Sequence, residues 1–127
     1  MSNPDDLRYT AQHEWLRIEG DEVTIGITDY AAEQLGDVVF VELPEIGARV
    51  ERGAVVAEVE STKSVGEVYA PAAGEVVARH DDVVDAPESI NGDAFEAWLF
   101  RLRVDDPASL EGSGLLDRKQ YLAQLGG

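Results

Sequence analysis

The sequence from residue 59 to residue 68 reads Val59-Glu60-Ser61-Thr62-Lys63-Ser64-Val65-Gly66-Glu67-Val68, two strand-like halves joined by a polar link. Lys63 lies at the centre of that link, so we predict a β-hairpin with this side chain at its tip. The neighbours of the lysine are small, which would leave its amine open to another protein: Ser61, Thr62, Ser64 and Gly66. A covalently attached, swinging cofactor requires a primary amine on a rigid support that holds it clear of the rest of the domain.

Two other interpretations of Lys63 stay open on spacing alone. An ordinary solvated turn lysine would look the same. A Schiff-base lysine is also conceivable, but it needs a desolvated pocket that lowers its pKa, and a hairpin tip beside acidic residues does not favour one. The rarity of lysine draws attention to this residue, since Lys63 and Lys119 are the two lysines among ten basic residues. Only lysine offers an amine that can be acylated.

Short strands separated by glycine or proline turns surround this segment. We predict them over residues 13–18, 23–27, 37–43, 55–60, 66–70 and 75–79, and around 98–102. In the stretch 55–60, Val55, Ala57 and Val59 should face one side, with the glutamates on the other. Many short strands with regular turns are typical of a small β-sandwich or barrel.

Short helices are predicted in the N-terminal half and at the C-terminus. Thr28 stands where an N-cap belongs, and Gly36 should end that helix in the left-handed conformation. Asp106 should cap a first C-terminal turn. Asp117 and Gln120 form a variant of the capping box before a last helix, whose apolar face would hold Tyr121, Leu122 and Leu125.

Composition limits the classes of function. The chain has 127 residues, which fits one domain over residues 1–127, and it has no cysteine, so it has neither disulfides nor thiolate metal ligands. A formal net charge of −16 disfavours binding to nucleic acid or to an anionic membrane. No apolar run reaches membrane-spanning length, and residues 1–6 do not resemble a signal peptide. We therefore expect a cytoplasmic protein.

The remaining polar residues do not suggest an enzyme. His13 and His80 are the two histidines, too few for a typical zinc site, although His13 and Glu14 could line a cleft. The aspartates around residues 81–85 lack the spacing of a calcium loop, so we expect a solvated loop there. No phosphate-binding glycine loop or catalytic triad is present in the sequence.

A set of motifs in order along the chain resembles the H proteins of the glycine cleavage system. The resemblance runs from about residue 7 to residue 125. It rests on Tyr9, His13-Glu14-Trp15-Leu16, Gly26-Ile27-Thr28-Asp29-Tyr30-Ala31, Gln34-Leu35-Gly36-Asp37, Val39-Phe40-Val41-Glu42-Leu43-Pro44, Gly47, Val59-Glu60-Ser61-Thr62-Lys63, Tyr69-Ala70-Pro71, Gly74-Glu75-Val76, Ile90-Asn91 and Trp98-Leu99.

The resemblance implies a mainly β fold, the barrel-sandwich hybrid of lipoyl and biotinyl carriers, with a lipoyl hairpin over about residues 55–70. Helices are implied in the N-terminal half and over about residues 107–125. It also implies lipoate attached covalently to Lys63, and modifying enzymes that recognise Glu60 and Gly74. The protein would be a monomeric, non-catalytic carrier with no metal.

The implied partners are a pyridoxal-phosphate glycine decarboxylase, a tetrahydrofolate-dependent aminomethyltransferase, dihydrolipoyl dehydrogenase and a lipoate ligase or lipoyltransferase. The carrier would shuttle the aminomethyl group of glycine from the first to the second, and the third would reoxidise it. We expect Glu14 and Glu67 to line a cleft that shelters the cationic end of the loaded arm. The chain departs from the family pattern just after the lysine, where Ser64-Val65-Gly66-Glu67 replaces small residues followed by Ser-Asp.

Several rival functions remain on the sequence alone. A lipoyl domain of a 2-oxoacid dehydrogenase or a biotin carrier would usually have Asp-Lys-Ala or Met-Lys-Met at the tip, where this chain has Thr62-Lys63-Ser64. An H-like lipoate relay, which passes its lipoyl group to 2-oxoacid dehydrogenase carriers, would also keep Lys63. An unmodified interaction domain would leave Lys63 bare.

Overall fold

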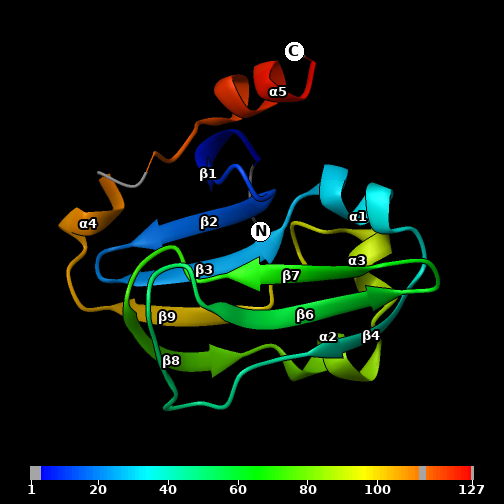
Figure 1. Cartoon of the computed structure of the whole chain (residues 1–127), viewed down its shortest axis with the longest axis horizontal. Coiled ribbons are helices and arrows are strands. Elements are labelled where there is room, and N and C mark those ends of the chain that lie inside the picture. The colour runs from blue at the N-terminus through cyan, green and yellow to red at the C-terminus, as the bar shows by residue number, and fades with distance from the viewer. Residues whose placement is uncertain (1–3, 112–113, 127) are drawn as a thin grey trace.

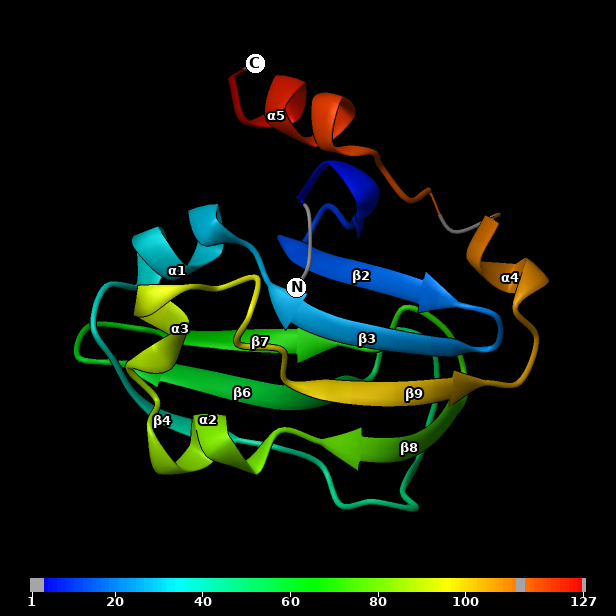
Figure 2. The same cartoon turned by 180° about the vertical axis from the view of Figure 1, so that it is seen from behind.

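The computed structural model describes residues 4–111 and 114–126 as two antiparallel β-sheets with short helices around them (Figures 1 and 2). Within these residues the larger sheet runs in the order β1 (Arg8–Tyr9), β2 (Glu14–Glu19), β3 (Glu22–Ile27), β9 (Phe100–Val104), β8 (Gly74–Arg79), β5 (Arg49–Val50). The smaller sheet runs in the order β4 (Val38–Glu42), β6 (Val55–Ser61), β7 (Val65–Tyr69). The predicted mainly β fold with two facing sheets is confirmed.

Apolar side chains of both sheets meet between them. Val23 and Ile25 of β3 and Leu102 of β9 are fully buried against Val59 of β6 and Val68 of β7. Alternate residues of a strand point to opposite faces, so each strand gives one row of side chains to this core. Each such side chain contributes about 1.5–3 kcal/mol on burial, and together they hold the smaller sheet on the larger one.

A second, smaller apolar cluster joins the C-terminal helix to the six-stranded sheet. Trp15 lies in it with Tyr9 and Tyr121, all three buried. The Trp15 indole lies over Gly26 of the paired strand, where a Cβ would come within 2.6 Å of the ring. Its Nε1 donates a hydrogen bond to the Ala94 carbonyl at 3.1 Å. Gly26 is therefore a glycine because the indole occupies the space above it.

The helix α1 (Asp29–Leu35) lies at the end of the sheets where β6 turns into β7 (Figure 1). Its predicted N-cap is confirmed, because Thr28 Oγ1 accepts the Ala31 amide at 3.1 Å. The predicted left-handed helical conformation of Gly36 is wrong. Its φ of 79° is positive as expected, but its ψ of −150° lies in a region open essentially to glycine alone.

Two further helices, α2 (Asp81–Asp85) and α3 (Ser89–Gly92), follow β8 (Figure 2). The C-terminal part holds α4 (Ala108–Glu111) and α5 (Arg118–Gly126), and a 3-10 turn, η1 (Pro4–Asp6), starts the described chain. Asp106 caps α4, accepting the Ala108 amide at 3.2 Å. The reciprocal cap of α5 is also confirmed, since the Asp117 amide donates to Gln120 Oε1 at 2.9 Å and the Gln120 amide to Asp117 Oδ1 at 2.7 Å. No helix of the described chain is long and apolar enough to cross a membrane.

Three further local predictions are wrong. Val55 is 46% exposed, because the pairing of β6 with β7 shifts register between Val55 and Ala57 and turns Val55 out of the core. Leu122 is 47% exposed, so the apolar face of α5 reduces to buried Tyr121 and half-buried Leu125. The acidic stretch expected as a loop forms α2 instead. The short strands β1 and β5 and the helix α3 have no counterpart in the prediction.

Candidate functional site

Lys63 is exposed at the turn between β6 and β7. The Ser61 amide donates to the Ser64 carbonyl at 2.8 Å, which closes the turn. The Ser61 hydroxyl oxygen then accepts the Lys63 amide at 3.3 Å and the Ser64 amide at 3.0 Å. The Ser61 side chain thus supplies the acceptor for two backbone amides of the turn, as serine side chains often do, and the lysine side chain stays exposed.

A second brace reaches the hairpin tip from the link between α1 and β4. The Thr62 amide donates to the Asp37 carbonyl at 3.2 Å. Asn91 of α3 fixes that link, since its Oδ1 accepts the Val38 amide at 2.9 Å and its Nδ2 donates to the Gly36 carbonyl at 2.7 Å. The sequence prediction gave Asn91 no role, and only the folded chain brings it to this link.

The Lys63 side chain lies beside Gly36. A Cβ on Gly36 would stand 3.4 Å from Lys63 Cε and 3.9 Å from Nζ. The positive φ of Gly36 favours glycine at this corner, where the chain leaves α1 and the lysine stem passes beside it. The amine is held near the end of α1 while remaining reachable.

A cleft of about 470 Å³ opens beside the hairpin. One wall consists of residues of β6 and β7, namely Val59, Gly66, Glu67 and Tyr69. The other wall comes from the turn before β2, the end of β3 and α1, namely Gln12, His13, Ile27, Tyr30, Ala31, Gln34 and Leu35. Leu35 packs against Gly66, where a Cβ would be in van der Waals contact with Leu35 Cδ1 at 3.4 Å. The contact between Leu35 and Gly66 joins the two walls of the cleft.

The two glutamates predicted for a cleft occupy different places. Glu67 is exposed, lines the cleft and accepts the Tyr69 hydroxyl at 3.2 Å. Glu14 is 2% exposed and lines a neighbouring hollow of about 390 Å³. Its carboxyl accepts the Thr10 hydroxyl at 3.0 Å and the Tyr69 amide. Tyr69 and Gln12 line both hollows, so Glu14 stands behind the cleft wall.

Burial dominates the electrostatics of Glu14. Desolvation raises its pKa from the ordinary 4.5 to about 7, and the hydrogen bonds from the Tyr69 amide and the Thr10 hydroxyl offset only part of that rise. Glu14 therefore changes its charge near neutral pH, directly behind a residue of the cleft.

The two residues expected to be read by modifying enzymes lie in different sheets. Glu60 is half-buried in β6, between Phe40 and Val65 of the neighbouring strands. Gly74 is buried in β8, where a Cβ would stand 2.3 Å from the Arg103 carbonyl oxygen. Gly74 is thus required by the close approach of β8 to β9, whatever else it does.

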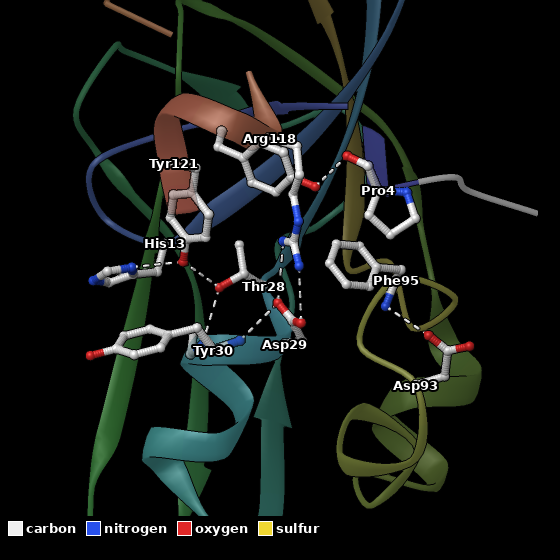
Figure 3. A network of polar contacts seen from close by, with 11 residues as sticks. Pro4, His13, Thr28, Asp29, Tyr30, Asp93, Phe95, Arg118 and Tyr121 are labelled. Carbon is white, nitrogen blue, oxygen red and sulfur yellow. Dashed lines mark hydrogen bonds and ion pairs between the residues drawn. The ribbon is translucent and has the colours of Figure 1, made fainter. Parts of the chain in front are cut away.

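A polar network at one end of the cleft joins His13, which lines the cleft, and the N-cap Thr28 to the Tyr121 hydroxyl, a polar role that sequence reasoning missed (Figure 3). The Tyr121 hydroxyl lies 2.8 Å from His13 Nδ1 and 2.7 Å from Thr28 Oγ1. His13 has a φ of 67°, in the left-handed region, and its ring lies 5.0 Å from that of Tyr30. Burial lowers the pKa of His13.

Comparison with known proteins matches nearly the whole chain to one family. Residues 7–126 match the family described as glycine cleavage H-protein. The chain belongs to this family. The H protein of the glycine cleavage system of Azoarcus sp. (strain BH72) is 52% identical over 124 residues, covering 96% of this chain and 95% of that relative. That of Aromatoleum aromaticum is 50% identical over 127 residues, covering 98% of each.

A solved structure agrees. The crystal structure of a glycine cleavage system H protein from Mycobacterium marinum aligns with a TM-score of 0.87 at 41% sequence identity, covering 98% of this chain and 100% of that one. The H-protein resemblance read from the motifs and the fold it implied are both confirmed.

Proposed function

We propose that this chain is the carrier subunit of a glycine cleavage system and holds lipoate in amide linkage on Lys63. It shuttles the aminomethyl group of glycine from a pyridoxal-phosphate glycine decarboxylase to a tetrahydrofolate-dependent aminomethyltransferase. Dihydrolipoyl dehydrogenase reoxidises it afterwards. The observation that carries this proposal is the exposed Lys63 amine, on a hairpin tip braced from two sides and next to a cleft, in a member of the H-protein family.

The surroundings of Lys63 fit covalent attachment. Amide formation needs an amine that a modifying enzyme can reach, and the small neighbours Ser61 and Ser64 leave that approach open. Lys119 is also exposed, but it lies on α5 rather than on a hairpin, which makes it a natural comparison. When attached, the lipoyl group supplies the disulfide and dithiol chemistry, while the residues of this chain bind, orient and exclude water.

The cleft is within reach of such an arm. A lipoyl-lysine is a chain of about twelve bonds, roughly 14 Å when extended. Glu67 lies four residues along the strand direction from Lys63, about 13 Å away at the usual rise of a strand. The loaded arm ends in an amine that is cationic when protonated, and the Glu67 carboxylate at the cleft would stabilise that cation. Glu14 would act from behind, by holding the Tyr69 backbone.

The lipoate ligase or lipoyltransferase would recognise the hairpin around Glu60. The Glu60 carboxylate lies in a row with exposed Phe40 and Val65, so an enzyme that approaches Lys63 along this sheet would meet a charge between two apolar side chains. Gly74 would contribute indirectly, by letting β8 lie against β9. A monomer in the cytoplasm, one carrier unit over residues 1–127 and the absence of a metal stay predictions.

Intact-mass spectrometry of protein from lipoate-supplemented cells tests the attachment. We expect a gain of one lipoyl group, mapped by peptide analysis to Lys63, no gain in Lys63→Arg, and an unchanged gain in Lys119→Arg. A biotin in its place, or an unmodified chain beside an active ligase, would refute the proposal. Glycine-dependent reduction with the partner enzymes then separates an H protein from a lipoate relay, which would carry the modification but fail that assay.

A further inference from the structure

We propose that Tyr121 of the C-terminal helix is a positioning residue for the arm cleft, holding the wall formed by His13 and α1 through its hydroxyl group. This inference rests on the proposed function, because it concerns the cleft that would shelter the loaded arm. The Tyr121 hydroxyl links the C-terminal helix to His13 and Thr28, which lie about 90 to 110 positions earlier in the chain.

The helix α5 depends on few side chains for its place on the molecule. Tyr121 is completely buried, and its ring stacks on Tyr9 at a centroid distance of 4.8 Å. Leu125 is half-buried, whereas Leu122 and Lys119 are exposed. A helix of nine residues is marginal by itself, so its position depends on these contacts and above all on Tyr121.

The Tyr121 hydroxyl reaches past the apolar cluster to the cleft wall (Figure 3). It lies between His13 Nδ1 at 2.8 Å and Thr28 Oγ1 at 2.7 Å. Thr28 is the N-cap of α1, and its amide donates to the His13 carbonyl at 3.0 Å. The hydroxyl therefore closes a small ring that fixes the histidine ring against the start of the helix.

His13 needs such support. Its φ of 67° is unusual for a residue with a side chain and costs free energy that neighbouring contacts must offset. Both His13 and Tyr30 line the cleft, and their rings lie 5.0 Å apart. Without the Tyr121 hydroxyl, the histidine ring would lose the partner that determines its orientation in the wall.

A second contact couples α5 to the same end of α1. The Arg118 guanidinium contacts both carboxylate oxygens of Asp29, at 3.4 and 3.3 Å. Asp29 Oδ1 in turn accepts the Tyr30 amide at 3.0 Å. Arg118 also lies 5.5 Å from the ring centroids of Tyr9 and Phe95, so it is part of the same packed corner. The opposite wall belongs to β6 and β7, so the contacts of α5 hold one of the two walls of the cleft.

The chain offers a matched control for removing the hydroxyl. Tyr121→Phe keeps the ring stacked on Tyr9 but breaks the link to His13 and Thr28. Tyr9→Phe keeps the same stack and also removes a phenol hydroxyl. That hydroxyl donates to the Pro4 carbonyl at 2.6 Å and interacts with Arg118, but it is not hydrogen-bonded to His13 or Thr28. Each variant loses the hydrogen bonds of one phenol hydroxyl, those to His13 and Thr28 in Tyr121→Phe and that to Pro4 in Tyr9→Phe, so a general loss of stability affects both.

The first readout uses the chain without lipoate. In Tyr121→Phe we expect the NMR signals of the His13 ring to move, with little change in Tyr9→Phe. The second readout is the lifetime of the loaded arm on lipoylated protein, prepared from the reduced arm with formaldehyde and ammonium. Its decay consumes one water and returns the thiol, formaldehyde and ammonium, and the released formaldehyde is measured.

We expect the decay to be roughly two- to tenfold faster in Tyr121→Phe than in Tyr9→Phe, the ratio that one hydrogen bond of ordinary net strength supports. Equal lifetimes in the two variants, with a long lifetime in the unaltered protein, would overturn the positioning role and leave the carrier function standing. Two results would instead count against the proposed function: decay of the loaded arm on the unaltered protein as fast as that of an aminomethylated small dithiol in solution, or a protein that is never lipoylated.

Discussion

Replacing Glu14 with glutamine should make the chain more stable at neutral and alkaline pH. Glu14 is 2% exposed, and desolvation raises its pKa to about 7. Glutamine has nearly the same shape and imitates the protonated acid. Its carbonyl can accept the Tyr69 amide, and its NH₂ can donate to the Thr10 hydroxyl oxygen.

Proton counting gives the sign and size of the effect. Between pH 4.5 and about pH 7 the folded chain keeps a proton on Glu14 that the unfolded chain has already released. The free energy of unfolding must therefore fall as the pH rises through this window, and it stays lowered above it. The shift of the pKa corresponds to about 3 kcal/mol. For a chain of this length that is about 10 °C in Tm.

Urea unfolding of wild type and Glu14→Gln at several pH values between 4 and 8.5 measures this directly. The advantage of the variant should grow by about 3 kcal/mol from the acidic to the alkaline end of the series. Glu67→Gln removes one negative charge at an exposed position and controls for the general repulsion in a chain of net charge −16. A difference between wild type and Glu14→Gln that is the same at every pH would refute the assignment of a buried, late-titrating carboxyl.

Two further substitutions test the frame around the site. Gly74→Ala should cost at least about 1–3 kcal/mol in urea unfolding, because its Cβ would stand 2.3 Å from the Arg103 carbonyl oxygen, and an unchanged midpoint would contradict this. A folded Gly74→Ala that is still lipoylated normally would exclude recognition of this glycine by the ligase. Asn91→Ala removes the hydrogen bonds to Val38 and Gly36 and should cost about 1–2 kcal/mol. Amide exchange at the start of β4 should quicken with it, and unaltered exchange would show that Asn91 does not hold this link.

Much of the local structure followed from the sequence because its causes are local. The caps at Thr28, Asp106 and Asp117 depend on residues two or three positions away, and all three are confirmed. The Lys63 hairpin was also predictable, since two strand-like halves and a polar link leave few other choices. The predicted burial of Val55 was wrong because the register shift between β6 and β7 turns its side chain to the other face of the sheet. The alternation of residues within one strand does not reveal such a shift.

The parts of the site that could not be predicted depend on contacts between distant segments. Asn91 looks like an ordinary loop residue until α3 brings it against the backbone of residues 36 and 38. Tyr121 reads as one apolar residue of a terminal helix, and its hydroxyl acquires a role only beside His13 and Thr28. Glu14 and Glu67 were both predicted to line a cleft. Their different chemistry follows from the burial of Glu14 and the exposure of Glu67, which the sequence does not show.

These contacts explain how a small helix can form a stable cleft wall. A helix of seven residues such as α1 has little stability of its own, so its place is set by what holds its ends. Tyr121 and Arg118 hold the first turn, through Thr28 and Asp29. Asn91 holds the other end, while the opposite wall is fixed by the ladder of β6 and β7. Changes at either end of α1 should therefore disturb this wall of the cleft, whereas the Lys63 turn keeps the hydrogen bonds of Ser61 and should stay exposed.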